Sequence, residues 1–114
     1  MEHENTAVGI AYVRLLVSSD AYEVSVRQLT TVIGQHPSVS SDTETHWELE
    51  QQPSHYGAHK RPPLLVLQVA DGNEEREYLQ THGPGIYEVG FRVTDESNTG
   101  IAQTPYGRLV WTIR

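Results

Sequence analysis

Four residues in two separate stretches of the chain have the types and spacing to do chemistry together. Tyr12 and Arg14 alternate with apolar residues, and so do Glu88 and Arg92, which flank Gly90. Side chains in a strand alternate between its two faces, so each set is predicted to lie on one face of a strand. Polar residues at these positions favour a ligand-binding face, because a packed interior would carry aliphatic side chains there.

The chemistry open to this set is the binding of an anionic oxygen together with proton transfer. Arg14 or Arg92 can clamp a carboxylate, phosphate or enolate oxygen, because the guanidinium is a planar and permanently charged donor. Glu88 is a candidate general base if the fold removes it from water, and Tyr12 is its candidate catalytic neighbour. The alternative is that Glu88 forms a structural ion pair with Arg14 or Arg92. Gly90, in the middle of its strand, fits either the close approach of a ligand or neighbouring segment, or a bulge.

The elements that position these residues follow from periodicity and from turn residues. The first helix is predicted to begin at Asp20, with Glu23 completing a capping box, and to end at Gly34. A second helix is predicted over residues 74–82, and residues 51–63 and the stretch after residue 94 are predicted to be loops. The strands are expected over residues 10–17, 43–50, 64–70, 86–93 and 108–113.

Length and composition limit the class of protein. The chain has 114 residues, no Cys and a net charge of -7, with 8 Lys and Arg against 15 Asp and Glu. This size predicts one domain over residues 10–114 behind a flexible tail of residues 1–9. The acidic balance argues against nucleic acid or an anionic membrane as a partner, and no apolar run is long enough to span a bilayer. A cytoplasmic protein is the expectation, without a thiolate nucleophile or a sulfur-based zinc site.

The sequence contains a degenerate internal repeat. Laying Ile10 over Ile86 matches the two strands without a gap, and laying Leu65 over Leu109 matches a second pair of strands. The second copy is shorter by about 32 residues, which is the length of one helix and one strand. The alternative is a coincidence between alternating strands.

The residues that join the two copies resemble a known family. The segment EYLQTHGPGIYEVGFRV (residues 77–93) resembles the helix, Gly-rich turn and strand that open the second module of the vicinal-oxygen-chelate (glyoxalase/bleomycin resistance/dioxygenase) superfamily. IAYVRLLVSSD, with the amphipathic helix that follows, is similar to the opening of its first module. The resemblance implies an α+β fold of paired βαβββ modules, the second one shortened, that form a curved, cup-shaped mixed sheet with helices on the convex side.

The resemblance also implies where a metal would be held. Metal-dependent members place His, Gln or Glu on the first and last strands of each module, and the corresponding positions here are Tyr12, Gln68, Glu88 and Thr112. Only Gln68 and Glu88 are of suitable types, and two such ligands bind a divalent ion weakly. We therefore expect no metal and no other cofactor, and Gln68 and Thr112 join the arginines as candidate substrate-binding residues.

Histidine and tryptophan residues offer weaker candidates. His55 and His59 have the spacing of a helical metal pair, but the prolines around them disfavour a helix. His46 shares a strand face with Glu48 and Glu50, which is either a metal set or a solvated edge. Trp111, like Trp47, is a candidate for stacking against a ligand or else a core aromatic.

Two functions are favoured. One is a glyoxalase-like enzyme, metal-independent, that acts on a small polar organic molecule by isomerase-, lyase- or cyclase-type proton transfer. The alternative is a non-catalytic protein of the same fold that sequesters such a molecule, and a structural or regulatory domain is a third possibility. A homodimer is predicted, because a shortened second module leaves part of the sheet uncovered.

Overall fold

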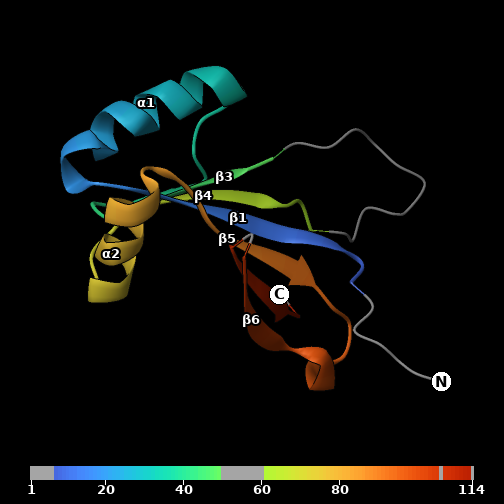
Figure 1. Cartoon of the computed structure of the whole chain (residues 1–114). Helices are drawn as coiled ribbons and strands as arrows, with labels where there is room; N and C mark the ends of the chain where they lie inside the picture. Colours follow the sequence, from blue (N-terminus) through green and yellow to red (C-terminus); the bar gives the residue numbers. More distant parts are fainter. Residues whose placement is uncertain (1–6, 50–60, 106, 114) are drawn as a thin grey trace.

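The computed structural model describes residues 7–49, 61–105 and 107–113, which form one mixed sheet and two α-helices (Figure 1). The helices are α1 (Tyr22–Ile33) and α2 (Asn73–His82). The strands are β1 (Gly9–Val17), β2 (Val39–Ser40), β3 (Glu44–Glu48), β4 (Leu64–Val69), β5 (Gly85–Arg92), β6 (Gly100–Thr104) and β7 (Gly107–Thr112). No helix within these residues is both long and apolar enough to cross a membrane.

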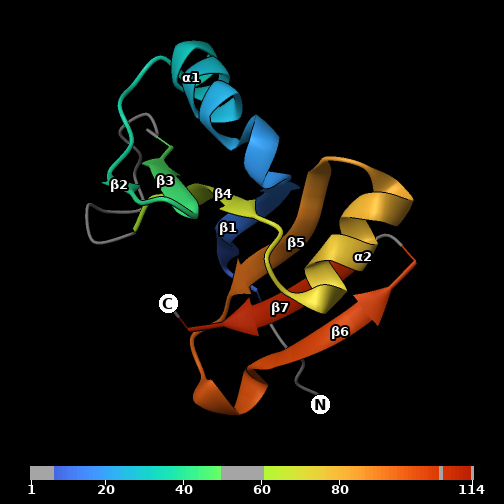
Figure 2. The same ribbon diagram turned by 90° about the vertical axis from the view of Figure 1, so that its left-hand side faces the viewer.

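The sheet consists of two related halves that meet at β1 and β5. The strand order is β2-β3-β4-β1-β5-β7-β6, with β1 parallel to β4, β5 parallel to β7, and β1 antiparallel to β5. Figure 2 shows the sheet as twisted and open. The predicted α+β class with paired modules is confirmed.

The register of the strands confirms the internal repeat. In the first half, Tyr12 of β1 lies beside Leu64 of β4, and in the second half their repeat counterparts, Glu88 of β5 and Arg108 of β7, lie beside each other. Within residues 85–105 and 107–113, the second half has three strands and only a short 3-10 turn (Glu96–Asn98) where the first half has α1. The second copy therefore lacks one helix and one strand, as its length predicts.

Helix α1 covers one face of the first half. Leu29 and Ile33, one turn apart, pack with Trp47 and Leu67 of the sheet, both of which are almost fully buried. The helix ends at Gly34, whose φ of +83° is the left-handed conformation that glycine adopts without strain.

The start of α1 corrects a prediction. Asp20 lies in a 3-10 turn (Ser19–Ala21), α1 begins at Tyr22, and no side chain caps its first turn, so the predicted capping box is wrong. The backbone N–H of Ala21 donates to the Ser18 carbonyl over 3.1 Å. A backbone turn therefore occupies the place that a capping side chain would take.

Helix α2 lies at the end of the sheet, against the face opposite to the one that α1 covers (Figure 2). The expectation that both helices lie on one convex side is therefore wrong. Its Tyr78 and Leu79 pack with Leu16, which shares its face of β1 with Arg14. The helix connects β4 to β5, which lie on either side of β1, and so it crosses the end of β1 on that face.

Strand β6 lies where a loop was predicted, and β2 lies in a stretch for which no element was predicted. β2 has two residues, and β6 reads GIAQT, so neither has a clear alternation of apolar and polar residues. Both are edge strands that pair with only one neighbour. Pairing within the sheet, rather than local propensity, makes them strands.

Candidate functional site

Glu88 is the centre of the candidate site. It lies in the middle of β5, 8% exposed, and its Oε2 accepts a hydrogen bond from the Tyr12 hydroxyl. Arg14 Nε lies 3.5 Å from the same oxygen, and Arg108 Nε lies 3.1 Å from Oε1. A buried carboxylate thus has a cation on each side and a neutral donor between them, which offsets the cost of removing its charge from water.

Strand pairing produces this arrangement. Arg14 is the cross-strand neighbour of Glu88 in the antiparallel pair of β1 and β5, and Arg108 is its neighbour in the parallel pair of β5 and β7. Glu88 therefore forms the predicted ion pair with Arg14, and its second ionic partner is Arg108. A role as general base and a role as structural ion pair both start from these contacts.

Gly90 makes room for Tyr12. The two residues are register partners, and a Cβ atom built at Gly90 would overlap the Tyr12 ring. The predicted close approach at Gly90 is therefore that of a neighbouring side chain.

The environment of Tyr12 keeps its hydroxyl protonated. Burial, followed by the hydrogen bond to Glu88 and the charge of Glu88, raises the pKa of Tyr12 from 10.0 to about 12, with Arg14 acting in the opposite direction. Tyr12 is therefore a proton-bearing donor at neutral pH.

The ion pairs continue across the sheet as a polar row, defined here as His46, Glu44, Arg14, Glu88, Arg108 and Glu74. At one end, Arg14 Nη1 lies 3.8 Å from Glu44 Oε1, and Glu44 Oε2 lies 2.5 Å from His46 Nε2. At the other end, Arg108 Nη1 lies 3.9 Å from Glu74 Oε2. From Glu44 to Glu74, carboxylates and arginine guanidinium groups alternate along the row.

Gln68 joins the polar row to α2. Arg14 Nη1 donates to Gln68 Oε1 over 2.5 Å, and Gln68 Nε2 donates to Glu75 Oε2 over 3.3 Å. This second bond fixes the amide with its oxygen toward Arg14.

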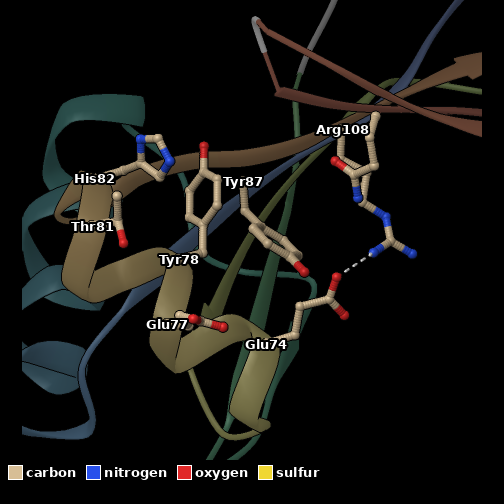
Figure 3. A pocket seen from close by; sticks show the side chains of 8 residues that line it. Glu74, Glu77, Tyr78, Thr81, His82, Tyr87 and Arg108 are labelled. Carbon is tan, nitrogen blue, oxygen red and sulfur yellow. Dashed lines mark ion pairs between the residues drawn. The ribbon is translucent and has the colours of Figure 1, made fainter.

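A pocket of about 390 Å³ opens beside Arg108, between α2 and the β6–β7 half of the sheet (Figure 3). Three rings line it: Tyr78 lies 4.2 Å from His82 and, edge-on, 5.0 Å from Tyr87, measured between centroids. Figure 3 shows Glu74 reaching toward Arg108 across the pocket. Arg108 is therefore in contact with Glu88 and also lines a space that a small molecule could occupy. The remaining lining residues are Glu77, Thr81 and Gln103.

The structure brings together four of the predicted site residues, Tyr12, Arg14, Gln68 and Glu88. Arg92 and Thr112 are register partners further along β5 and β7, and alternation places both on the face of Glu88.

Trp111 is not brought to the polar row. It lies on the other face of β7, where its ring centroid is 5.9 Å from that of Phe91. Neighbouring side chains in a strand point to opposite faces, so Trp111 and Thr112 lie on different faces of β7.

Arg108 is the site residue that the sequence analysis missed. A signal was present, because Arg108 lies four residues before Thr112 and so shares its face. The repeat also places Arg108 at the counterpart of Leu64, the register partner of Tyr12.

The histidine candidates have different outcomes. His46 pairs with Glu44 instead of forming the predicted set with Glu48 and Glu50, of which Glu50 lies outside the described residues. His55 and His59 also lie outside them. Within the described ranges, no cluster of three or more His, Asp or Glu residues has metal-binding geometry.

Solved structures share this architecture. Methylmalonyl-CoA epimerase from Mycobacterium tuberculosis aligns over 98% of this chain and 93% of its own, with 14% identity and a TM-score of 0.54. A variant of the Streptomyces coelicolor enzyme in complex with 2-nitronate-propionyl-CoA aligns over 96% and 100%, with 12% identity and a TM-score of 0.57. No family model matches the sequence, and no curated protein matches it. The chain has the vicinal-oxygen-chelate fold. At these identities the similarity establishes the fold alone.

The vicinal-oxygen-chelate fold places Tyr12, Gln68, Glu88 and Thr112 on β1, β4, β5 and β7, the first and last strands of each module. This donor set does not fit a divalent ion. Tyr12 presents a protonated hydroxyl that is already donated to Glu88, and the Arg14 guanidinium lies against both Gln68 and Glu88. A permanent positive charge in that place repels a metal cation.

Proposed function

We propose that the protein is a small-molecule enzyme that transfers a proton on its polar face, with isomerase-, lyase- or cyclase-type chemistry and without a metal or other cofactor. The observation that carries this proposal is the buried Glu88 carboxylate held between Tyr12, Arg14 and Arg108. A base, a hydroxyl hydrogen-bond donor and two cations within one cluster are the components that carbon acid chemistry requires.

The proposed reaction begins with loss of a proton from a carbon next to a carbonyl group. Glu88 accepts the proton, and the electron pair of the C–H bond becomes the C=C bond of an enolate. Arg14 and Arg108 stabilise the charge on the enolate oxygen, and the Tyr12 hydroxyl turns from Glu88 to donate to it. Return of the proton to another face or position gives an isomer, whereas departure of a leaving group gives a lyase product.

The expected substrate is a small polar organic molecule with an anionic or carbonyl oxygen. Arg92 and Thr112, further along the same face, are proposed to contact the rest of the molecule, as is Gln68. The comparison structures are named as methylmalonyl-CoA epimerases, and one of them as a complex with 2-nitronate-propionyl-CoA. These names support isomerase-type chemistry on a small organic ligand.

The second candidate function is sequestration of a ligand without turnover. The ring-lined pocket beside Arg108 favours it, because aromatic faces bind planar or cationic ligands. Recovery of a bound ligand chemically unchanged would identify this function.

Deuterium incorporation tests the enzymatic proposal. The protein is incubated in D₂O with a panel of 2-keto acids, 2-hydroxy ketones and acyl thioesters, and NMR follows exchange at carbon. We expect exchange of at least one compound, a loss of 100-fold or more in Glu88→Gln, and a smaller loss in Arg92→Ala. Glu23→Gln, an exposed carboxylate on α1, is the control. Undiminished exchange by Glu88→Gln would overturn the assignment of the base.

We further propose that the protein acts in the cytoplasm as a homodimer. The half of the sheet formed by β5, β6 and β7 has no α-helix of its own within residues 85–105 and 107–113. The face that carries Phe91 and Trp111 is half-buried. A second copy is the simplest cover for such a face, because closed two-fold dimers are the commonest assembly.

A further inference from the structure

We propose that the Arg14 guanidinium is a built-in cation that replaces a divalent ion in the vicinal-oxygen-chelate fold, and that its charge is what keeps this oxygen-lined site closed to metals. Removing the charge should open a divalent-cation site formed by Glu88, Gln68 and Glu44. The inference goes beyond the proposed function, because it concerns cation binding whether or not the protein is an enzyme.

Three oxygen-bearing side chains surround the Arg14 guanidinium at hydrogen-bond or ion-pair distances. Its Nη1 lies 2.5 Å from Gln68 Oε1 and 3.8 Å from Glu44 Oε1, and its Nε lies 3.5 Å from Glu88 Oε2. The guanidinium carbon lies 5.3 Å from the centroid of the Tyr12 ring, a cation–π distance. Three oxygen groups and one aromatic face thus converge on a single charge.

The surroundings explain why this site needs a cation. Glu88 is buried, and the side chain of Glu44 is only 36% exposed, so their charges are incompletely screened by water. Without Arg14, the Glu44 and Glu88 carboxylates and the Gln68 oxygen would face one another across the space that its side chain leaves. Carboxylate and amide oxygens are the ligands that hard divalent cations prefer.

The surrounding groups also hold the oxygens in place when Arg14 is changed. The Gln68 amide is fixed by Glu75, and Glu88 keeps its contacts with Tyr12 and Arg108. His46 remains beside Glu44, where its Nε2 lies 2.5 Å from the carboxylate. The positions of these oxygen donors therefore do not depend on Arg14 alone.

Titration with Mn²⁺ tests the inference. Binding to the wild-type protein, Arg14→Ala and Arg14→Lys is followed at neutral pH by isothermal calorimetry and by the loss of the free-ion electron paramagnetic resonance signal. We expect Arg14→Ala to bind one Mn²⁺ at least tenfold more tightly than the wild type. Arg14→Lys keeps the charge and should show no gain, and adding Glu88→Gln to Arg14→Ala should abolish the gain.

Arg76→Ala is the matched control, because Arg76 is an exposed arginine that also pairs with a carboxylate, at 3.6 Å from Asp71. It should bind Mn²⁺ no better than the wild type. Stoichiometric binding by the wild type with the affinity of Arg14→Ala would overturn the inference, and so would a folded Arg14→Ala without any gain. If Arg14→Ala does not fold, thermal unfolding of Arg14→Met with and without Mn²⁺ decides, and an unchanged midpoint overturns the inference.

Discussion

Gly90 lies opposite Tyr12 at the junction of the two modules, and the missing side chain at Gly90 is the space that the Tyr12 ring occupies. This contact allows the hydroxyl to reach Glu88, which lies two residues before Gly90 on the same face. The position of the Tyr12 hydroxyl relative to the carboxylate is therefore set by a residue that has no functional group.

Gly90→Ala is expected to be strongly destabilising. The new Cβ would overlap the Tyr12 ring, and displacing the ring also breaks the hydrogen bond to Glu88. Overpacking of this kind costs about 1–3 kcal/mol. Urea unfolding followed by circular dichroism measures the loss.

The double variant Tyr12→Ala/Gly90→Ala is the control for this steric origin. It removes the ring that the new Cβ would meet, so Gly90→Ala should cost much less in the Tyr12→Ala background than in the wild type. Equal costs in the two backgrounds would show that the contact between these residues is not the cause.

The stability of the protein should fall as the pH rises from about 10 to about 12. The pKa of Tyr12 is raised by burial and by Glu88 to about 12, so the folded protein holds this proton more tightly than the unfolded chain, in which the pKa is 10.0. This contribution to stability is fully present below pH 10 and is lost as the pH approaches 12. Urea unfolding at a series of pH values measures it.

Tyr12→Phe should remove part of this pH dependence. Burial raises the pKa of Tyr87 as well, with the charge of Glu74 acting in the same direction, so some dependence should persist in the variant. Absorbance at 295 nm should show that the tyrosine titration step near pH 12 of the wild type is missing from Tyr12→Phe. An unchanged titration curve at high pH would contradict this assignment.

Alternation and the internal repeat sufficed to predict the polar face. A period of two places Tyr12 with Arg14 and Glu88 with Arg92, and the gap-free match of residues 10 and 86 predicts that the two strands are equivalent. The structure pairs these strands directly, which brings the two polar sets together.

Contacts that depend on the pairing of distant strands could not be predicted in the same way. Arg108 reaches Glu88 only because β7 lies parallel to β5 in one particular register, and a shift of a single residue would turn it to the other face. Its ring chemistry makes Trp111 a candidate for ligand stacking, but alternation places it on the face opposite to Thr112. The start of α1 was misplaced because the Ser18 carbonyl competes with side chains for the first free N–H groups.

Glu88 and Arg108 should be energetically coupled. A double-mutant cycle with Glu88→Gln and Arg108→Gln is expected to give a coupling of about 1–3 kcal/mol in the free energy of unfolding, because the carboxylate is buried and the contact is 3.1 Å. The matched control is the pair of Arg108 with Glu74, whose side chain is 72% exposed and 3.9 Å away. That pair should couple by less than about 1 kcal/mol. Equal couplings would contradict a special role of the buried pair.

The homodimer proposal predicts a mass near twice 12.8 kDa in sedimentation at micromolar concentration. Trp111→Lys should shift the population toward monomer, because it places a charge on a face of β5 and β7. The half of the sheet that contains these strands has no α-helix within residues 85–105 and 107–113 to cover that face. Val32→Lys is the control, since Val32 is an exposed apolar residue, 80% accessible, on α1 of the other half. It should leave the mass unchanged. A wild-type mass of 12.8 kDa would refute the dimer, and a dimer that Val32→Lys dissociates while Trp111→Lys does not would place the interface on α1 instead.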